Sequence, residues 1–444
     1  MTPEELNALV KRVEGNFRRD LVVSMKFNEF TTIMAVPWYI KMRMMSIRMV
    51  YMIFFIRSCF MTYAFLFLKR HSPSAVKIRY YCVDIFEGLG SLGCLLNTVY
   101  GVGFLLLLMH FKMFCTSEKK NNLHVLNHLK QSMEIDFTPQ ERKEFARVLE
   151  KMAVQGKYTF FLVTLALSLG NLYAAVVTGQ SMKEKMSDQK IRALDKYVKH
   201  SIPVMIGYFM ANYFGIQWLL YGHMITAHSV NYFRIRIKRI YNLLQDWREI
   251  EMIKRIITKE TEEKKEGDEK EEEEPEPEPV VDLEKVLLEL QSLFNEIAIH
   301  NKMVKVILRD IKTFMGIMCR VIIIFVVTRE TNYVKKLILI VIVLCILTGT
   351  LMTLHNASQV YLDLRKISKE LHSVQIMIER DSMTNMSQFY SLKMFVKKMI
   401  QWTSSDRLPL GLTVGDSGSL HPNRAGLFLP NTIKISLMIL NARY

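Results

Sequence analysis

Five side chains near the expected outer ends of apolar helices have the chemistry of a small-molecule binding site. Tyrosine rings offer faces for stacking, and carboxylate or amide groups orient a ligand through hydrogen bonds. The candidates, which suit a small organic compound such as a sugar or a bitter compound, are Glu87, Asn171, Tyr173, Tyr208 and Tyr213. A second interpretation stays open, in which the tyrosines form belts at the membrane surface and the carboxylate lies at the water boundary.

Two arginines fall inside apolar stretches of the sequence. Arg57 lies near the middle of one stretch and Arg320 within another. A lone cation at mid-membrane costs at least about 2.5 kcal/mol, so each arginine requires a partner or access to water. Glu87 is the nearest carboxylate to Arg57 by expected depth, and the alternative is that the arginine side chain reaches toward the membrane surface.

The sequence lacks the motifs of the common catalytic classes. It has no Walker loop, no GxSxG elbow, no HExxH pair and no kinase signature. His124 and His128 stand four residues apart, but no glutamate follows the first, and their basic surroundings are typical of surface histidines. We therefore expect no enzyme activity, no cofactor and no bound metal.

The composition is that of a membrane protein. Half of the 444 residues are hydrophobic and 29 are Met. The formal net charge is +16, but Lys and Arg stand between apolar stretches rather than in one stripe, so we expect no nucleic-acid partner. The six cysteines are scattered, which argues against a disulfide framework. The polar start, Met1 to Asp20, is no cleavable signal peptide, so the first apolar helix should direct membrane insertion.

Six apolar runs are each close to the roughly 20 residues that a helix needs to cross a lipid bilayer. The runs are Met49 to Leu68, Val83 to Phe111, Tyr158 to Thr178, Ile202 to Tyr221, Ile311 to Thr328 and Leu337 to Leu354. The sequence therefore predicts an all-α fold in which a bundle of helices crosses the membrane six times.

Basic residues are unequally divided between the segments that separate these runs. One alternate set holds 39 Lys and Arg, and it consists of residues 1–48, 112–157, 223–310 and 355–406. The other set holds 13, in residues 69–82, 180–201 and 329–336. Cytoplasmic segments are enriched in Lys and Arg, so the N-terminus is predicted to be cytoplasmic. The glycosylation sequons at Asn356 and Asn385 should then remain unmodified.

Three cytoplasmic segments carry apolar residues at intervals of three and four, which indicates amphipathic helices. Their apolar faces are Val230, Phe233, Ile237, Ile240, Leu244 and Trp247; Leu283, Val286, Leu287, Leu290, Leu293, Phe294 and Ile297; and Val360, Leu364, Ile367, Leu371 and Val374, followed by Phe389, Leu392, Phe395, Val396 and Met399. We expect these faces to form a helical platform below the membrane and to pack against another subunit.

The predicted division of the chain follows from these patterns. An acidic insertion at 259–282 contains 13 acidic residues and an EPEPEP run, and we expect it to be disordered. The predicted parts are a cytoplasmic segment 1–48, spans one to four in 49–222, cytoplasmic helices with the insertion in 223–310, spans five and six in 311–354, a cytoplasmic helical region 355–406 and a tail 407–444.

This layout resembles the insect gustatory receptor family, whose members are seven-span ligand-gated cation channels with a cytoplasmic N-terminus. The resemblance covers most of residues 30–401 and is carried by LLELQSLFNEIAIHNKMVKVI (Leu287 to Ile307), ASQVYLDLRKISKELHSVQ (Ala357 to Gln375) and QFYSLKMFVKKMIQ (Gln388 to Gln401). It implies that these stretches form cytoplasmic helices of the subunit contact, and that four subunits surround a pore lined by a seventh helix.

The end of the chain departs from the family. The family has a Thr-Tyr pair, five mostly apolar residues and Gln-Phe in its seventh helix, and nothing after Gln401 matches this signature. The segment DRLPLGLTVGDSGSLHPNRAGLFLP, Asp406 to Pro430, is too rich in Gly, Pro and charge for a seventh span. Gln388 and Phe389 have polar neighbours in a predicted cytoplasmic segment, so they are not that motif either.

The resemblance implies a chemosensory, gustatory receptor subunit in the plasma membrane of sensory neurons. It would act as a ligand-gated cation channel for small tastants and assemble as a homo- or hetero-tetramer. One alternative is a six-span transporter or membrane lipid enzyme, for which we would expect a Gly/Pro-broken helix pair or an intramembrane His or Asp cluster. Another is a non-conducting receptor subunit, which the altered tail favours.

Overall fold

The computed structural model describes ten segments and four further residues near the end of the chain. They are 2–6, 8–9, 38–68, 72–89, 91–119, 137–184, 191–265, 282–328, 333–381 and 386–404, with 430, 431, 434 and 438. Within these segments the regular structure is helical and no strand occurs, which confirms the predicted all-α class. The tail 407–444 lies almost wholly outside the described residues, as do His124, His128 and Asn385.

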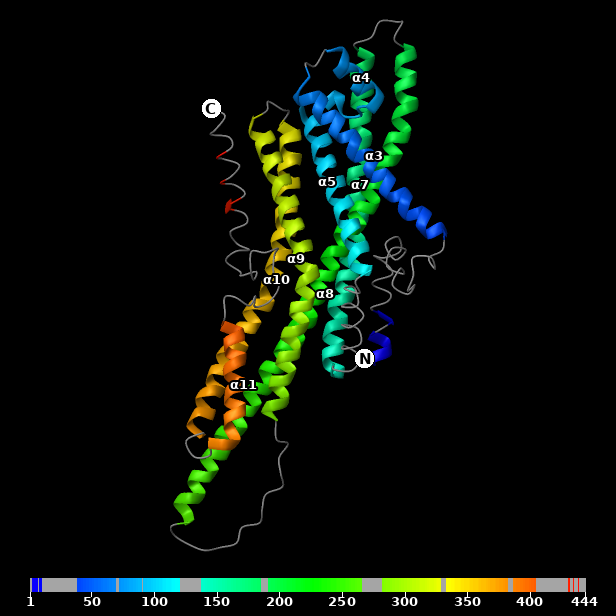
Figure 1. The fold of residues 1–444 in the computed structure, drawn as a ribbon. Helices are drawn as coiled ribbons and strands as arrows, with labels where there is room; N and C mark the ends of the chain where they lie inside the picture. The colour runs from blue at the N-terminus through cyan, green and yellow to red at the C-terminus, as the bar shows by residue number, and fades with distance from the viewer. Residues whose placement is uncertain are drawn as a thin grey trace. The chain divides into compact units, whose positions relative to one another are not determined.

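The fold divides into two compact units. Unit 1 comprises Met1–Ile225, Asp310–Thr348 and Leu429–Tyr444, and unit 2 comprises Thr226–Arg309 and Gly349–Phe428. Unit 1 contains α3 (Trp38–Leu66), α4 (Pro73–Cys82), the 3₁₀ helix η3 (Glu87–Leu89), α5 (Ser91–Lys119) and α7 (Pro139–Glu184). Helices α8 (Ile191–Lys265), α9 (Leu283–Thr328) and α10 (Tyr333–Asp381) contribute to both units, and α11 (Met386–Ser404) belongs to unit 2 (Figure 1).

Several helices begin at residues that satisfy the free backbone N–H groups of a first turn. At the start of α7 the Thr138 hydroxyl accepts from the Glu141 N–H at 3.3 Å, while the Glu141 carboxylate accepts from the Thr138 N–H at 2.7 Å. This reciprocal pair is a capping box, and Pro139 occupies the first helical position between them. Asp282 caps α9 by accepting from the Glu284 N–H at 3.0 Å.

Unit 1 is built around the packing of α3 on α5. The turn before α5 is folded into the same bundle, because η3 contacts both α5 and α7. The apolar core of unit 1 is formed by α3, the turn before η3, α5, α7 and α8, and comprises Tyr51, Phe54, Val83, Ile85, Phe86, Phe104, Ala174, Tyr208 and Ala211. Part of the segment 69–82, which was expected to be only a loop, is the helix α4.

Two described helices are long and apolar enough to cross a membrane, judged by length and composition. They are Met45–Ala64 within α3 and Phe161–Gln180 within α7, and Gly93–Met109 within α5 is a shorter apolar helix. These segments overlap the first three predicted spans. The other three predicted spans lie in α8, α9 and α10, where many side chains fall outside the described residues. The count of six spans and their orientation stay predictions.

In unit 2 the predicted apolar faces form a common core. Most of the predicted positions on α8, α9 and α10 are buried, and Val360, Leu364, Ile367, Leu371 and Val374 of α10 are all fully buried. On α11 the core positions are Val396, Met399 and Ile400. Trp247 and Phe294 are only partly buried. The intervals of three and four along α8 and α10 are those of packed amphipathic helices, as predicted.

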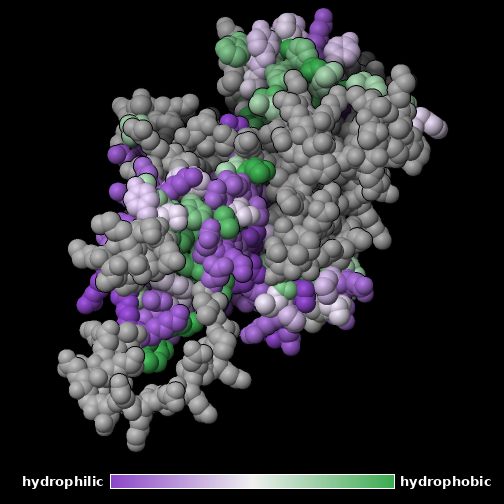
Figure 2. Space-filling view, turned by 60° about the horizontal axis from the view of Figure 1, so that its bottom comes forward, coloured by the Kyte–Doolittle hydropathy of each residue, from purple (hydrophilic) through white to green (hydrophobic). Residues whose placement is uncertain are grey.

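The expectation that these faces need another subunit is wrong for the residues that are buried here. They pack against one another within one chain, so the apolar stripes are already covered. Figure 2 shows one face of the molecule, on which hydrophilic residues cover much of the described surface and hydrophobic ones form smaller groups.

Ion pairs link α8 to its neighbours in unit 2. Arg236 of α8 is buried and pairs with Glu296 of α9 at 2.7 Å, and Arg248 of α8 pairs with Glu370 of α10 at 2.8 Å. Burial disfavours the charge of Arg236, but the neighbouring Tyr232 and Glu296 outweigh this effect and raise its pKa above the ordinary value. The Arg236 cation is therefore a permanent part of the core of unit 2.

Helix α8 extends further than the sequence suggested. It continues to Lys265, so residues 259–265 are helical and do not belong to the disordered insertion; residues 266–281 lie outside the described part. The same helix includes Pro203 in its interior. The sequon at Asn356 lies within α10, and its Ser358 hydroxyl is buried and donates to the His355 carbonyl at 2.7 Å.

Candidate ligand site

Arg57 is buried in unit 1, and its guanidinium donates hydrogen bonds to three oxygen atoms. Its Nε–H donates to the Cys82 carbonyl at 2.7 Å and its Nη2–H to the Val83 carbonyl at 2.8 Å. Nη1–H donates to the Tyr208 hydroxyl, and the guanidinium carbon lies 5.2 Å from the centre of that ring. Arg57 thereby joins α3 to the end of α4 and to α8.

The turn between α4 and η3 is held by side chains from three helices. Thr178 of α7 donates to the Ile85 carbonyl at 2.9 Å, and Asn97 of α5 donates to the Asp84 carboxylate at 3.2 Å. The same carboxylate oxygen accepts from the Phe86 N–H at 3.1 Å. Together with Arg57 from α3, these bonds satisfy most of the polar groups that the turn brings into the bundle.

The backbone of this turn is strained at one residue. Val83 has a φ of 50°, a conformation that costs energy for a β-branched residue. Its carbonyl is one of the acceptors of Arg57. The turn also lies close to α5, because a side chain at Gly93 would collide with the Phe86 carbonyl. We infer that the surrounding hydrogen bonds and close packing maintain the strained conformation.

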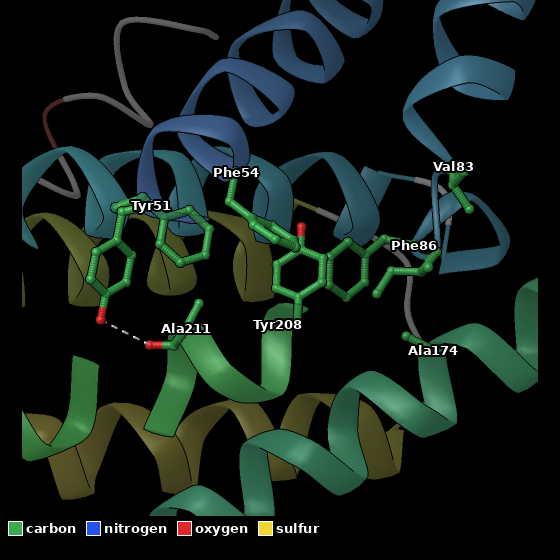
Figure 3. Packing of buried hydrophobic residues seen from close by; sticks show 9 residues of the cluster. Tyr51, Phe54, Val83, Phe86, Ala174, Tyr208 and Ala211 are labelled. Carbon is green, nitrogen blue, oxygen red and sulfur yellow. Dashed lines mark hydrogen bonds between the residues drawn. The ribbon is translucent and has the colours of Figure 1, made fainter. Parts of the chain in front are cut away.

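Aromatic rings surround the Tyr208 side chain. Its ring meets those of Phe54, Tyr100 and Phe86 edge to face, with centroid distances of 4.8, 4.9 and 5.7 Å. Figure 3 shows Tyr208 between Phe54 and Phe86, with Tyr51 on the other side of Phe54. Close approach is possible at this point because residue 207 is glycine, and a side chain there would strike the Phe54 ring.

A short chain of polar groups runs beside these rings. Asn212 Nδ2 donates to the Tyr100 hydroxyl at 3.4 Å, and the Tyr100 hydroxyl donates to Asn171 Oδ1 at 3.1 Å. The three residues come from α8, α5 and α7. This arrangement of rings around fixed amide and hydroxyl groups is the chemistry that orients a small organic ligand.

The structure brings together two of the five residues predicted to bind a ligand. Tyr208 and Asn171 both lie in this cluster, and Tyr100 contacts each of them. Tyr173 is 57% exposed and lies on the outer side of α7. Tyr213 is partly buried and stacks on Phe209. Glu87 pairs with Arg79 at 3.5 Å at the edge of the bundle.

The predicted partner of Arg57 is not the one that the structure shows. Arg57 binds two backbone carbonyls and Tyr208, whereas the ion pair of Glu87 is with Arg79. Arg320 lies in α9 and is partly buried, and its Nε atom has no hydrogen-bond partner among the described residues. It follows the buried Cys319.

Sequence reasoning missed several residues of the cluster. Asn97, Tyr100 and Phe104 recur at intervals of three and four on α5, so they share one helix face, and this spacing was a usable signal. Phe54 and Asn212 had no comparable signal, because their importance depends on which helices become neighbours. Among the described residues no three His, Cys, Asp or Glu side chains could share a metal ion.

A comparison with protein-family models and with curated proteins found no match to this sequence.

Proposed function

We propose that the chain is a chemosensory receptor subunit, similar to gustatory receptors, that binds a small tastant within unit 1. The proposed subunit crosses the plasma membrane of sensory neurons six times, with a degenerate seventh span and a cytoplasmic N-terminus, and it works in a homo- or hetero-tetrameric cation channel. The cluster around Tyr208 carries this proposal, because it combines stacking faces with fixed hydrogen-bonding groups.

The surface around that cluster supports a membrane setting. Apolar side chains face outward along α7, where Phe161, Leu165 and Leu169 are 61%, 43% and 55% exposed. Polar groups such as Asn97, Asn171 and Asn212 are instead buried between helices. Apolar side chains on the outside and polar side chains between the helices are expected where lipid instead of water surrounds a helical bundle.

The charges of the site favour a neutral ligand. Each of the three guanidinium nitrogens of Arg57 donates a hydrogen bond within the protein, and one oxygen of the Asp84 carboxylate accepts two. A charged ligand would have to displace these bonds and lose its own hydration. A neutral compound with an aromatic or sugar-like face can leave these bonds in place, and it loses less hydration free energy on binding than an ion does.

Ligand binding can be tested by thermal unfolding of the purified full-length protein in lipid nanodiscs. We expect neutral probes, fructose or caffeine, to raise the melting temperature of the wild type, and cationic quinine to leave it unchanged. Asn171→Leu should lose the response because it removes the amide, while Tyr173→Leu, changed on the exposed side of the same helix, should retain it.

Two results would contradict the proposed site. One is a panel of neutral sugars and bitter compounds that leaves the wild-type melting temperature unchanged throughout. The other is a ligand response that Tyr173→Leu removes and Asn171→Leu preserves. Current recording is a separate test: since no residue after Gln401 matches the pore signature, we expect little or no current from this subunit expressed alone.

A further inference from the structure

Five buried polar atoms in unit 1 have no hydrogen-bond partner among the described residues, and three of them belong to residues at one turn of α5 or in contact with it. These three are Ser58 Oγ of α3, Asn97 Oδ1 of α5 and Asn171 Nδ2 of α7; the other two are Thr164 Oγ1 and Arg320 Nε. The exposed fractions of Ser58, Asn97 and Asn171 are 1%, 2% and 5%, so bulk solvent does not reach them. Buried polar atoms of this kind are usually satisfied by protein or by ordered water.

The bonds that these residues do make fix the character of the remaining atoms. Asn97 Nδ2 donates to the Asp84 carboxylate, which only accepts hydrogen bonds. Asn97 Oδ1 therefore remains as an acceptor. The Tyr100 hydroxyl accepts from Asn212 Nδ2 and donates to Asn171 Oδ1, so the Nδ2 of Asn171 remains as a donor. The Ser58 hydroxyl can do both.

All three residues meet the same turn of α5. Asn97 and Tyr100 are one helical turn apart, and Asn171 is bonded to Tyr100. Ser58 packs against Gly101, the residue after Tyr100, because a Cβ placed at Gly101 would lie 2.9 Å from the Cβ of Ser58. The turn from Asn97 to Gly101 is thus bordered by one acceptor, one donor and one hydroxyl.

We propose that this turn of α5 holds an internal water site. Water is the small molecule that can donate to Asn97, accept from Asn171 and do either with Ser58. Protein interiors contain such waters where otherwise unsatisfied polar groups converge, and in a membrane bundle bulk water is not available as a substitute. The water site does not depend on the identity of any tastant.

X-ray hydroxyl-radical footprinting of the full-length protein in nanodiscs tests the proposal. Radicals formed from a bound water oxidise the nearest rings, even where the bulk solvent has no access. We expect Tyr100 to be oxidised several-fold faster than Phe233, which is a fully buried aromatic residue in unit 2. The double variant Asn97→Leu/Asn171→Leu removes the acceptor and the donor, and should lower the rate at Tyr100 to that of Phe233.

Either of two results would overturn the proposal. The first is that Tyr100 is oxidised no faster than Phe233 in the wild type. The second is that the oxidation rate of Tyr100 is unchanged in the double variant, which would mean that the radicals arrive from the bulk solvent. The first comparison needs no substitution, so the proposal remains testable if the double variant does not fold.

Discussion

Arg57 is a buried cation whose hydrogen bonds go to neutral oxygen atoms. Two of them are backbone carbonyls at the end of α4, one on the strained residue Val83. Removing the guanidinium would leave these carbonyls buried without a donor, which is more costly than the loss of an ordinary surface contact. The residue therefore stabilises a particular turn as well as a helix pair.

We expect Arg57→Met to destabilise the protein by about 3 kcal/mol, because the acceptors it leaves are buried. The matched comparison is Arg79→Met, which breaks the 3.5 Å pair with the partly exposed Glu87 and should cost less than Arg57→Met. Chemical unfolding in detergent micelles, followed by circular dichroism, compares the two variants.

A charge exchange separates this explanation from the sequence-based one. If Arg57 were paired with Glu87, the double variant Arg57→Glu/Glu87→Arg would recover the stability that the single variants lose. Since the structure gives these residues different partners, we expect no recovery. Recovery to near the wild-type value would contradict the arrangement described for Arg57.

At the residue scale the sequence predicted which residues lie within apolar helices better than it predicted the side of the helix on which each side chain lies. Hydropathy identified Tyr208 and Asn171 as polar residues inside apolar runs, and both are buried in the cluster. Tyr173 was expected beside them and lies on the outside of α7, because two residues along a helix turn the side chain by more than half a circle. Two of the three partners of Arg57 are backbone carbonyls, which leave no trace in residue types, and the third, Tyr208, lies on a helix that the sequence did not place beside α3.

At the scale of helices, unit 2 shows what the periodicity of apolar residues can predict and what it cannot. The intervals of three and four correctly identified the buried faces of α8, α9 and α10. They could not identify the partner, since an apolar stripe has the same pattern whether it meets its own chain or another subunit. The ion pairs of Arg236 and Arg248 settle this within the chain.

We expect Leu364→Ala, in the buried stripe of α10, to cost about 2–5 kcal/mol, as core truncations do. Ile376 lies on the same helix but is 68% exposed, so Ile376→Ala should change the stability by less than about 0.5 kcal/mol. Chemical unfolding provides the measurement. A loss for Leu364→Ala that disappeared at low protein concentration would indicate a stripe covered by another subunit instead.

At the scale of the whole molecule, charge and hydropathy predict a topology that the fold leaves open. The two described helices of spanning length and the shorter one in α5 agree with the first three predicted spans, but they carry no orientation. The sequence supplies it through the excess of Lys and Arg in one set of segments. The packing of the helices does not determine which end of the bundle faces the cytoplasm.

Epitope tags test that topology. Tags at Met1 and at residue 270, within the segment 266–281, should be bound by antibody only after the plasma membrane is permeabilised, whereas a tag at residue 70, between α3 and α4, should be bound in intact cells. Binding to the first two tags in intact cells would invert the topology and remove the basis of the receptor assignment.

Pro203 gives α8 a property that neither its length nor its composition conveys. A proline has no N–H to offer the carbonyl four residues earlier, so the helix is weakened at that position while it remains continuous on either side. The weak point stands only five residues before Tyr208. Movements of the preceding turns can therefore be absorbed at the proline, while Tyr208 stays anchored by Arg57 and the surrounding rings.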